Sequence, residues 1–376
     1  MNSTEAVVGA ELRIRCSRDA LADRLSIVSR AVSSRTAVQI LAGVSLQAEG
    51  DRVTLAATDM ELSLRSSLEG DVEVQGSVVI PGRLLVELTR LLPESEVVLE
   101  HRPDEHVARI TCGSATYALN TYNTEDFPRL PDVELVDRFA VDREALLETV
   151  SRVGRSASRD ESRPVLTGIL VRFEAGKLVM AATDSYRLSV KETALDANVP
   201  ELEAIVPARA LGELTRIAQG AAEVEIGVHE NHVVFAVNDV LLTTRRIDGQ
   251  FPNYRQLLPE TFEHELALPR AELLDVVRRM ALLAQRNSPL RLRFAEGELT
   301  VSAQTQDVGE ARESLPIAFS GEPLEIGFNA DFLRDGIESV EEDELRFRLI
   351  SALRPGLIRS ESGDFSYLIM PIRLAG

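Results

Sequence analysis

The chain has 376 residues, a length typical of two or three domains rather than one. Hydrophobic residues make up 44% of it, which excludes a wholly disordered protein. Asp and Glu number 60 against 41 Lys and Arg, and the resulting net charge of −19 excludes a uniformly basic surface for nucleic acid.

The first predicted elements are a helix over 21–33 and a strand-rich block over 53–64. In the helix, apolar residues recur every three or four positions, which is typical of an amphipathic helix. A second helix is predicted to begin after Pro81, because proline is favoured at the start of a helix.

The same elements return about 125 residues later. A helix is predicted over 143–156, two strands over 168–174 and 177–182 with an Ala-Gly turn between them, and a second helix after Pro207. The closing strands of this copy are predicted over 223–228 and 233–237. The sequence Ala-Ala-Thr-Asp occurs in both copies, with Thr58 and Thr183 at equivalent positions, and Phe127-Pro128 recurs as Phe251-Pro252.

A third, fainter copy begins with a helix over 270–284 and continues with a strand over 299–305 after a Glu-Gly turn. A period near 125 residues is too long for a solenoid repeat, so each copy is a domain. We predict three tandem homologous domains over 1–131, 132–255 and 256–376. Two helices on one face of a mainly antiparallel sheet place each domain in the α+β class.

No arrangement of residues typical of catalysis or of metal or cofactor binding is found in the sequence. His229 and His232 are three apart, but a turn between two strands explains them better than a metal site. Cys16 and Cys112 are expected to be buried core residues in a reducing compartment. The sequence also has no signal peptide and no apolar run long enough for a membrane span, so a cytoplasmic protein without catalytic residues, metal or cofactor is expected.

Arginines recur on the predicted helices at spacings that place them on one face. All basic residues except two are arginines, and the second helices of the first two copies each carry a pair seven residues apart. A solvated helix face is the alternative, because Glu87 and Glu213 stand four residues after an arginine. The recurrence in all three copies favours a shared basic surface.

The chain resembles a known family, the bacterial DNA polymerase III β subunits, which are the sliding clamps of replication. The resemblance covers essentially the whole chain after a short N-terminal extension. It depends on the threefold repeat and on three motifs, at 182–188 (Ala-Thr-Asp-Ser-Tyr-Arg-Leu), 251–259 (Phe-Pro-Asn-Tyr-Arg-Gln-Leu-Leu-Pro) and 367–374 (Tyr-Leu-Ile-Met-Pro-Ile-Arg-Leu). The chain departs from the family at Gln39, where relatives often have proline before the Ile-Leu pair.

The resemblance implies a head-to-tail ring of two chains that encircles double-stranded DNA without reading its sequence. It implies as partners the α subunit of the replicative polymerase, the clamp loader, and repair polymerases and other proteins with clamp-binding peptide motifs. A repeated-domain scaffold that does not encircle DNA is the alternative, and an enzyme with its site at a domain boundary is a more distant one.

Three groups of site residues follow. The predicted DNA-facing side chains, one from the resemblance (Arg35) and the others from helix spacing, are Arg24, Arg35, Arg83, Arg90, Arg152, Arg155, Arg209, Arg216 and Arg279. The resemblance implies a peptide-binding groove between the second and third domains, formed by Leu166, Thr183, Ser185, Tyr186, Arg187, Leu188, Pro252, Leu257, Leu368, Met370, Pro371, Ile372 and Arg373. It also implies a dimer interface that includes Tyr117, Leu119, Leu282 and Leu283.

Overall fold

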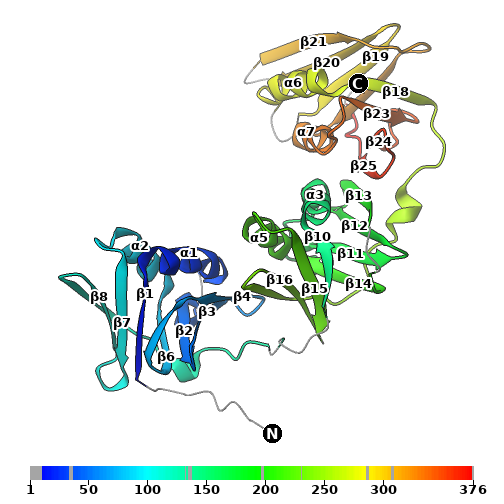
Figure 1. The fold of residues 1–376 in the computed structure, drawn as a ribbon. Coiled ribbons are helices and arrows are strands. Elements are labelled where there is room, and N and C mark those ends of the chain that lie inside the picture. The colour runs from blue at the N-terminus through cyan, green and yellow to red at the C-terminus, as the bar shows by residue number, and fades with distance from the viewer. Residues whose placement is uncertain are drawn as a thin grey trace. The chain divides into compact units, whose positions relative to one another are not determined.

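The computed structural model describes residues 11–33, 37–131, 133, 138–195, 199–229, 231–284, 288–305 and 309–374. The chain forms two compact units, one of residues 1–143 with 213–246 and the other of residues 144–212 with 247–376 (Figure 1). The units do not follow the three repeats, because strands from successive repeats share sheets.

The first unit contains two antiparallel sheets. The smaller has the strand order β5-β1-β7-β8-β9, and the larger has the order β10-β15-β16-β17-β4-β3-β2-β6. The strands are β1 (Leu12–Ser17), β2 (Gly43–Glu49), β3 (Arg52–Thr58), β4 (Leu62–Leu68), β5 (Gly70–Val74), β6 (Gly76–Pro81), β7 (Glu96–Arg102), β8 (Val107–Cys112), β9 (Ala115–Asn120), β10 (Arg138–Asp142), β15 (Glu223–His229), β16 (His232–Val237) and β17 (Val240–Arg245). Helices α1 (Arg18–Val28) and α2 (Gly82–Leu91) pack against each other and against these strands.

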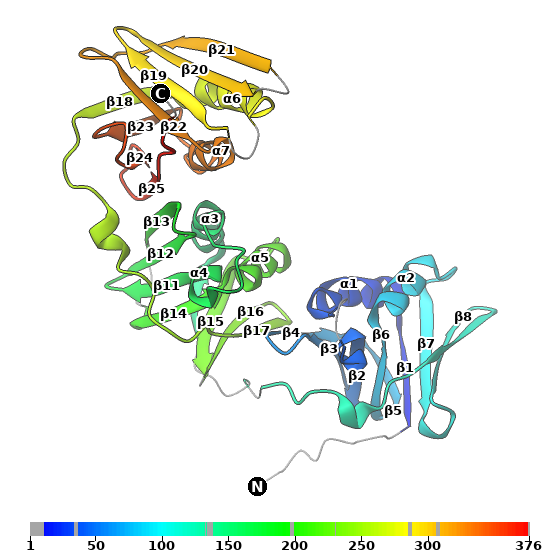
Figure 2. The same ribbon diagram turned by 180° about the vertical axis from the view of Figure 1, so that it is seen from behind.

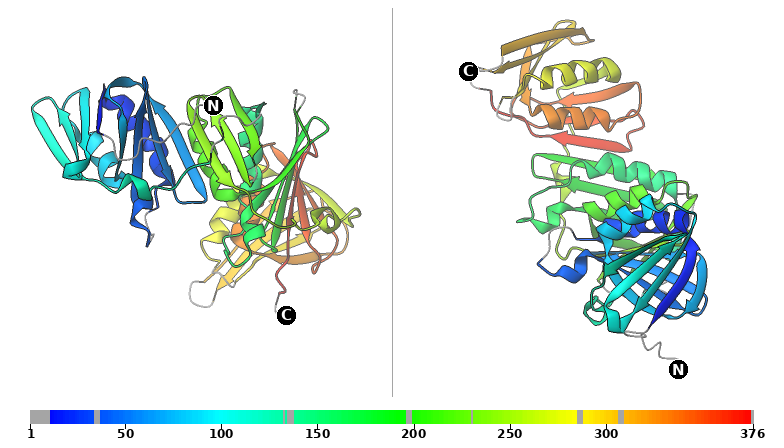
Figure 3. Two further views of the ribbon diagram at one scale, coloured as in Figure 1. Left: turned by 90° about the horizontal axis from the view of Figure 1, so that it is seen from below. Right: turned by 90° about the vertical axis from the view of Figure 1, so that its left-hand side faces the viewer.

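The second unit repeats this plan. One sheet has the order β14-β11-β12-β13-β25-β24-β23-β18 and the other has the order β21-β20-β19-β22. The strands are β11 (Gly168–Glu174), β12 (Lys177–Thr183), β13 (Arg187–Ala194), β14 (Leu202–Pro207), β18 (His264–Pro269), β19 (Leu290–Ala295), β20 (Glu298–Thr305), β21 (Gly309–Pro316), β22 (Leu324–Phe328), β23 (Glu344–Leu349), β24 (Gly356–Arg359) and β25 (Phe365–Ile369). Its helices are α3 (Arg143–Gly154), α4 (Pro164–Thr167), α6 (Arg270–Ala281) and α7 (Ala330–Glu338), and α6 packs against α7 (Figure 3). Helix α5 (Ala208–Ile217) crosses from the second unit into the first at Glu213.

The predicted helices and strands are present, with shifted ends. The helix predicted over 21–33 begins three residues earlier, because the side chain of Ser17 accepts a hydrogen bond from the Ala20 amide and caps it. It ends at Val28 and continues as a short 3₁₀ turn, Ser29–Ala31. Pro81 and Pro207 end strands directly before α2 and α5 rather than lying inside the first helical turn.

Successive repeats are joined edge to edge through their sheets. Strand β17 of the second repeat pairs with β4 of the first, and β25 of the third repeat pairs with β13 of the second (Figure 2). Beside this second junction lies an apolar cluster that includes Leu170, Val179 and Leu188 from the second repeat and Leu357 and Leu368 from the third. At each of these junctions a single sheet therefore contains strands of two repeats.

Candidate functional site

A tight turn between β12 and β13 positions the residues of the predicted groove. The Thr183 hydroxyl donates a hydrogen bond to the Arg187 carbonyl (2.7 Å) and accepts one from the Ser185 amide (3.1 Å). The Asp184 carboxylate accepts hydrogen bonds from the amides of Tyr186 and Arg187 at 2.9 and 3.0 Å. These bonds hold Ser185 in the left-handed region (φ 79°) and present the Tyr186 side chain, which is 61% exposed.

The Arg187 side chain is occupied inside the protein. Its guanidinium pairs with Asp184 and with Asp335 of α7, and it stacks 4.3 Å from the ring centre of Phe332. Only 10% of the side chain is exposed. Arg187 thus positions the turn against α7.

The C-terminal segment crosses the same turn. The Met370 amide donates a hydrogen bond to the Tyr186 carbonyl (2.8 Å), and the Ile372 amide donates one to the Gly327 carbonyl (2.8 Å). Met370 is 42% exposed, and Tyr186 lies stacked beside Phe332 with ring centres 6.5 Å apart. Exposed Tyr186 and Met370, with half-buried Phe332 beside Tyr186, therefore form an apolar surface, which we call the tail surface.

The other predicted groove residues differ in exposure. Leu188 and Leu368 face each other across β13 and β25 and are buried, as is Thr183, so they support the tail surface from below. Leu166, Pro252, Pro371 and Ile372 are half-buried, whereas Ser185, Leu257 and Arg373 are exposed. Sequence reasoning missed Phe332, although its place three residues after Asn329, the cap of the third repeat's second helix, was a usable signal.

Two of the predicted DNA-facing arginines instead join the second repeat to the third. Arg152 is 7% exposed and pairs with Glu148 (2.7 Å) and with Glu341 (2.9 Å). Arg155 pairs with Glu338 and, at 3.7 Å, with Asp335. The spacing on α3 correctly placed both arginines on one face, but that face meets the third repeat, so Arg152 is buried and cannot serve as a DNA contact.

A buried lysine continues this ionic junction. Lys191 is 3% exposed and pairs with Asp364 of the third repeat and, at 3.6 Å, with Glu148. Burial disfavours the charged form of Asp364, yet hydrogen bonds from Lys191, Ser362 and Ser360 outweigh that effect and hold its carboxyl pKa below the ordinary value.

This junction predicts an acid-sensitive stability. A carboxyl whose pKa is lowered by folding stabilises the protein above its unfolded pKa, and that stabilisation is lost as the pH falls through its folded pKa. We expect Asp364→Asn to lower the free energy of unfolding by about 1 kcal/mol at pH 7, since the carboxylate is partly exposed. The loss should shrink as the pH falls below the ordinary aspartate pKa and vanish once the pH lies below the folded pKa of Asp364. Urea unfolding across a pH series from 7 downward tests this, with exposed Asp51→Asn as the control, and an effect that does not change with pH would contradict it.

The remaining predicted arginines are at least partly exposed. Arg83 of α2 is 90% exposed in its side chain and pairs with Glu87 four residues on, while Arg90 is exposed at the end of the same helix. Arg209 and Arg216 are exposed on α5, and Arg216 pairs with Glu213. Arg24 on α1 pairs with Asp239, and Arg279 on α6 pairs with Glu313. Arg35 lies outside the described residues.

The predicted interface residues lie at or beside sheet edges. Tyr117 and Leu119 belong to β9, the edge of the smaller sheet of the first unit, and Leu119 is only 9% exposed. Leu282, just after α6, is 84% exposed, whereas Leu283 packs against the core of the third repeat. Leu282 is therefore the most exposed apolar side chain of this group.

The described residues bring no three His, Cys, Asp or Glu side chains together as metal ligands. Burial raises the pKa of the Cys16 thiol to about 12, so it is not a nucleophile at neutral pH. In the described part of the chain, no helix combines the length and apolar character that a membrane crossing requires.

Comparison with known proteins agrees with this geometry. Family models of the DNA polymerase III beta subunit match residues 12–131 (N-terminal domain), 140–253 (central domain) and 255–373 (C-terminal domain). The beta sliding clamp of Synechococcus elongatus is 35% identical over 376 residues, covering 96% of this chain and 100% of that protein, and that of Streptomyces coelicolor is 32% identical over 379 residues, covering 97% and 100%. Among solved structures, the sliding clamp from Bacillus subtilis has a TM-score of 0.92 at 28% identity, and the Bartonella birtlesii clamp bound to griselimycin has 0.89 at 30%; each comparison covers 97% of this chain and 100% of the other. The chain belongs to the DNA polymerase III beta subunit family, the sliding clamps of DNA polymerase.

Proposed function

We propose that two copies of this chain close head to tail into a ring around duplex DNA, as a processivity factor without catalytic activity. The observation that carries the proposal is the pairing pattern of the sheets. The edge strands of the four sheets include β9 in the first repeat and β21 in the third, and these two are equivalent to strands that pair between repeats.

The pattern follows from the repeats. Each repeat contributes two groups of strands. In the first repeat one group ends in β4, which pairs with β17, the last strand of the second repeat. In the second repeat the equivalent group ends in β13, which pairs with β25, the last strand of the third repeat. The equivalent strand in the third repeat is β21, and the equivalent last strand in the first repeat is β9. These two are unpaired edges within the described residues, and none of the eight residues of β21 is buried. Pairing β21 of one copy with β9 of another would repeat the junction, and two such contacts close a ring.

The arginines of α2 and α5 support a weak, sequence-independent contact with DNA. Their partners Glu87 and Glu213 lie on the same helices. Ion pairs between exposed side chains contribute little, so phosphates can compete for these guanidinium groups. A ring retained by topology needs only such loose contacts, and this also explains why an acidic protein can hold DNA.

We expect the combined change of Arg83, Arg90, Arg209 and Arg216 to glutamine to lower clamp loading and retention on duplex DNA by about tenfold, because four phosphate contacts are lost. The thermal midpoint should change little, since all four side chains are exposed. The control replaces the exposed Arg52 and Arg293. Unchanged loading by the fourfold variant would exclude these helices as the DNA-facing surface.

The tail surface fits a short extended peptide with apolar side chains. Solved clamps from Bartonella birtlesii and Pseudomonas aeruginosa are described as bound to griselimycin, and one from Caulobacter crescentus as holding polyethylene glycol at a region suggested to tether the β-motif. In this chain we assign that role to the tail surface with Leu166, Leu257 and Arg373. The partners of the tail surface that we propose are the polymerase α subunit, the clamp loader and repair polymerases, which act in the cytoplasm. We also propose that the three domains span residues 1–131, 132–255 and 256–376.

A further inference from the structure

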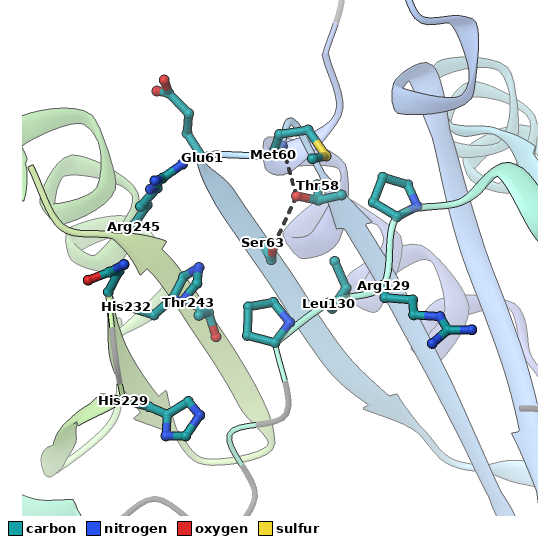
Figure 4. Close-up of a pocket in the computed structure, with 13 residues that line it drawn as sticks. Thr58, Met60, Glu61, Ser63, Arg129, Leu130, His229, His232, Thr243 and Arg245 are labelled. Carbon is teal, nitrogen blue, oxygen red and sulfur yellow. Dashed lines mark hydrogen bonds between the residues drawn. The ribbon is translucent and has the colours of Figure 1, made fainter. Parts of the chain in front are cut away.

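A cleft of about 420 Å³ lies at the other repeat junction, where β17 pairs with β4 (Figure 4). One wall holds Thr58 and Ser63 of the first repeat, and the other holds His229, His232 and Thr243 of the second. The chain that connects the two repeats crosses it with residues 128–131. This cleft shares no residue with the tail surface.

The cleft contains a turn of the same type as the turn below the tail surface. The Thr58 hydroxyl donates to the Leu62 carbonyl (3.0 Å) and accepts from the Met60 amide (3.0 Å), and the Asp59 carboxylate accepts from the amides of Glu61 and Leu62. Met60 has the same φ of 79° as Ser185 in the other turn.

The chain at the end of the last strand, which passes over this turn, is also equivalent in the two junctions. The Arg245 amide donates a hydrogen bond to the Glu61 carbonyl (3.0 Å), as the Met370 amide does to the Tyr186 carbonyl. Arg245 therefore occupies the place of Met370, and Glu61 that of Tyr186.

The side chains at these equivalent places differ in chemistry. The strand pairings place Ser63 where the other junction has Leu188, and Thr243 where it has Leu368. The charged residues that line the cleft are Arg129, Arg245 and Glu61, joined by two histidines. Positive residues thus outnumber the single carboxylate, on a protein whose net charge is −19.

One apolar feature remains in the cleft. Met60 is 63% exposed, and Leu130 lies on the crossing segment beside the prolines at 128 and 131. A bound segment would therefore meet an apolar contact between two arginines.

We propose that this cleft is a second peptide site, which binds a short extended acidic segment carrying one apolar side chain. The shared turn supplies the geometry, and charge complementarity supplies the selectivity, because carboxylates are repelled by most of this acidic surface and attracted by Arg129 and Arg245. The cleft volume lies in the range of sites that bind small ligands, so the cleft would hold the central part of such a segment. The assignment goes beyond the tail surface and needs no binding there.

The test measures fluorescence anisotropy of a fluorescein-labelled octapeptide of aspartates with one central leucine, titrated with the full-length protein. The same peptide with asparagines in place of aspartates is the ligand control. Three variants are compared with the unaltered chain: Arg129→Glu/Arg245→Glu in the cleft, Arg52→Glu/Arg293→Glu as an exposed pair of equal charge change, and Tyr186→Ser/Met370→Ser in the tail surface.

We expect saturable binding of the acidic peptide to the unaltered chain, a loss of at least about tenfold in the cleft variant, and a change below about twofold in the other two. The asparagine peptide should not bind. Absence of saturable binding would overturn the proposal, and so would equal losses in the two charge-reversal variants, which would indicate attraction to net charge alone. A loss only in the tail-surface variant would assign the peptide to that site and also overturn the proposal. Failure of the tail surface to bind its own apolar peptides would refute only the proposed function.

Discussion

Deletion of residues 370–376 is expected to abolish binding of apolar clamp-binding peptides, while the dimer persists. The deletion removes Met370, one of the exposed anchors beside Tyr186, and the main-chain bond that holds the segment over the turn. A few buried anchors dominate interfaces of this kind, so losing them should weaken binding by about a hundredfold or more. Titration calorimetry with a motif peptide gives the affinity, and sizing chromatography gives the oligomeric state.

The deletion also removes contacts inside the third repeat. Ile372 bonds to Gly327, and the Leu374 side chain lies close enough to Gly327 that an added Cβ would meet it at 2.6 Å. Tyr186→Ser/Met370→Ser is therefore the companion variant, because both side chains are exposed and the backbone stays intact. Peptide affinity that is unchanged in both variants would refute the assignment of the tail surface.

If the chain forms the proposed ring, replacing Leu282 and Leu283 by alanine should convert that dimer into folded monomers. Leu282 is 84% exposed in one chain, and in the proposed ring the strand β9 of the second copy would cover it. Losing this apolar area costs about 2 kcal/mol at each of two interfaces, which weakens the dimer about a thousandfold.

The matched control is Leu91→Ala. Leu91 is also a leucine at the end of a helix and is 80% exposed, but it belongs to α2, which is not part of the proposed interface. Sedimentation velocity across a dilution series measures the effect. A Leu282→Ala/Leu283→Ala variant that remains dimeric at the same dilution as the Leu91→Ala control would contradict the proposed interface.

Much of the fold could be predicted because the repeat displays each element more than once. The hairpin over 168–174 and 177–182 appears as β11 and β12 with its Ala-Gly turn, and both turn residues have positive φ. The shared Ala-Ala-Thr-Asp sequence has the same structure in both copies, because Thr58 and Thr183 end β3 and β12 with equivalent hydrogen bonds.

Side-chain partners from distant parts of the chain could not be predicted. Helical spacing places Arg152 and Arg155 on one face, but it does not reveal that Glu341 and Glu338, from the third repeat, cover that face. For the same reason the contacts of Phe332 could not be predicted. Its ring reaches Arg187 and Tyr186 because β25 pairs with β13. Local periodicity determines which way a side chain faces, whereas the identity of its neighbour depends on strand order.

The central claim is that this chain holds DNA by encircling it. The most direct measurement loads labelled protein onto nicked circular DNA with a clamp loader and ATP, isolates the complex by gel filtration, and then linearises half of the sample with a restriction enzyme. We predict that the protein stays on the circle and is released from the linear DNA over its free ends, at moderate salt where nonspecific contacts are weak. Equal retention on circular and linear DNA would show that binding does not depend on topology and would contradict the ring.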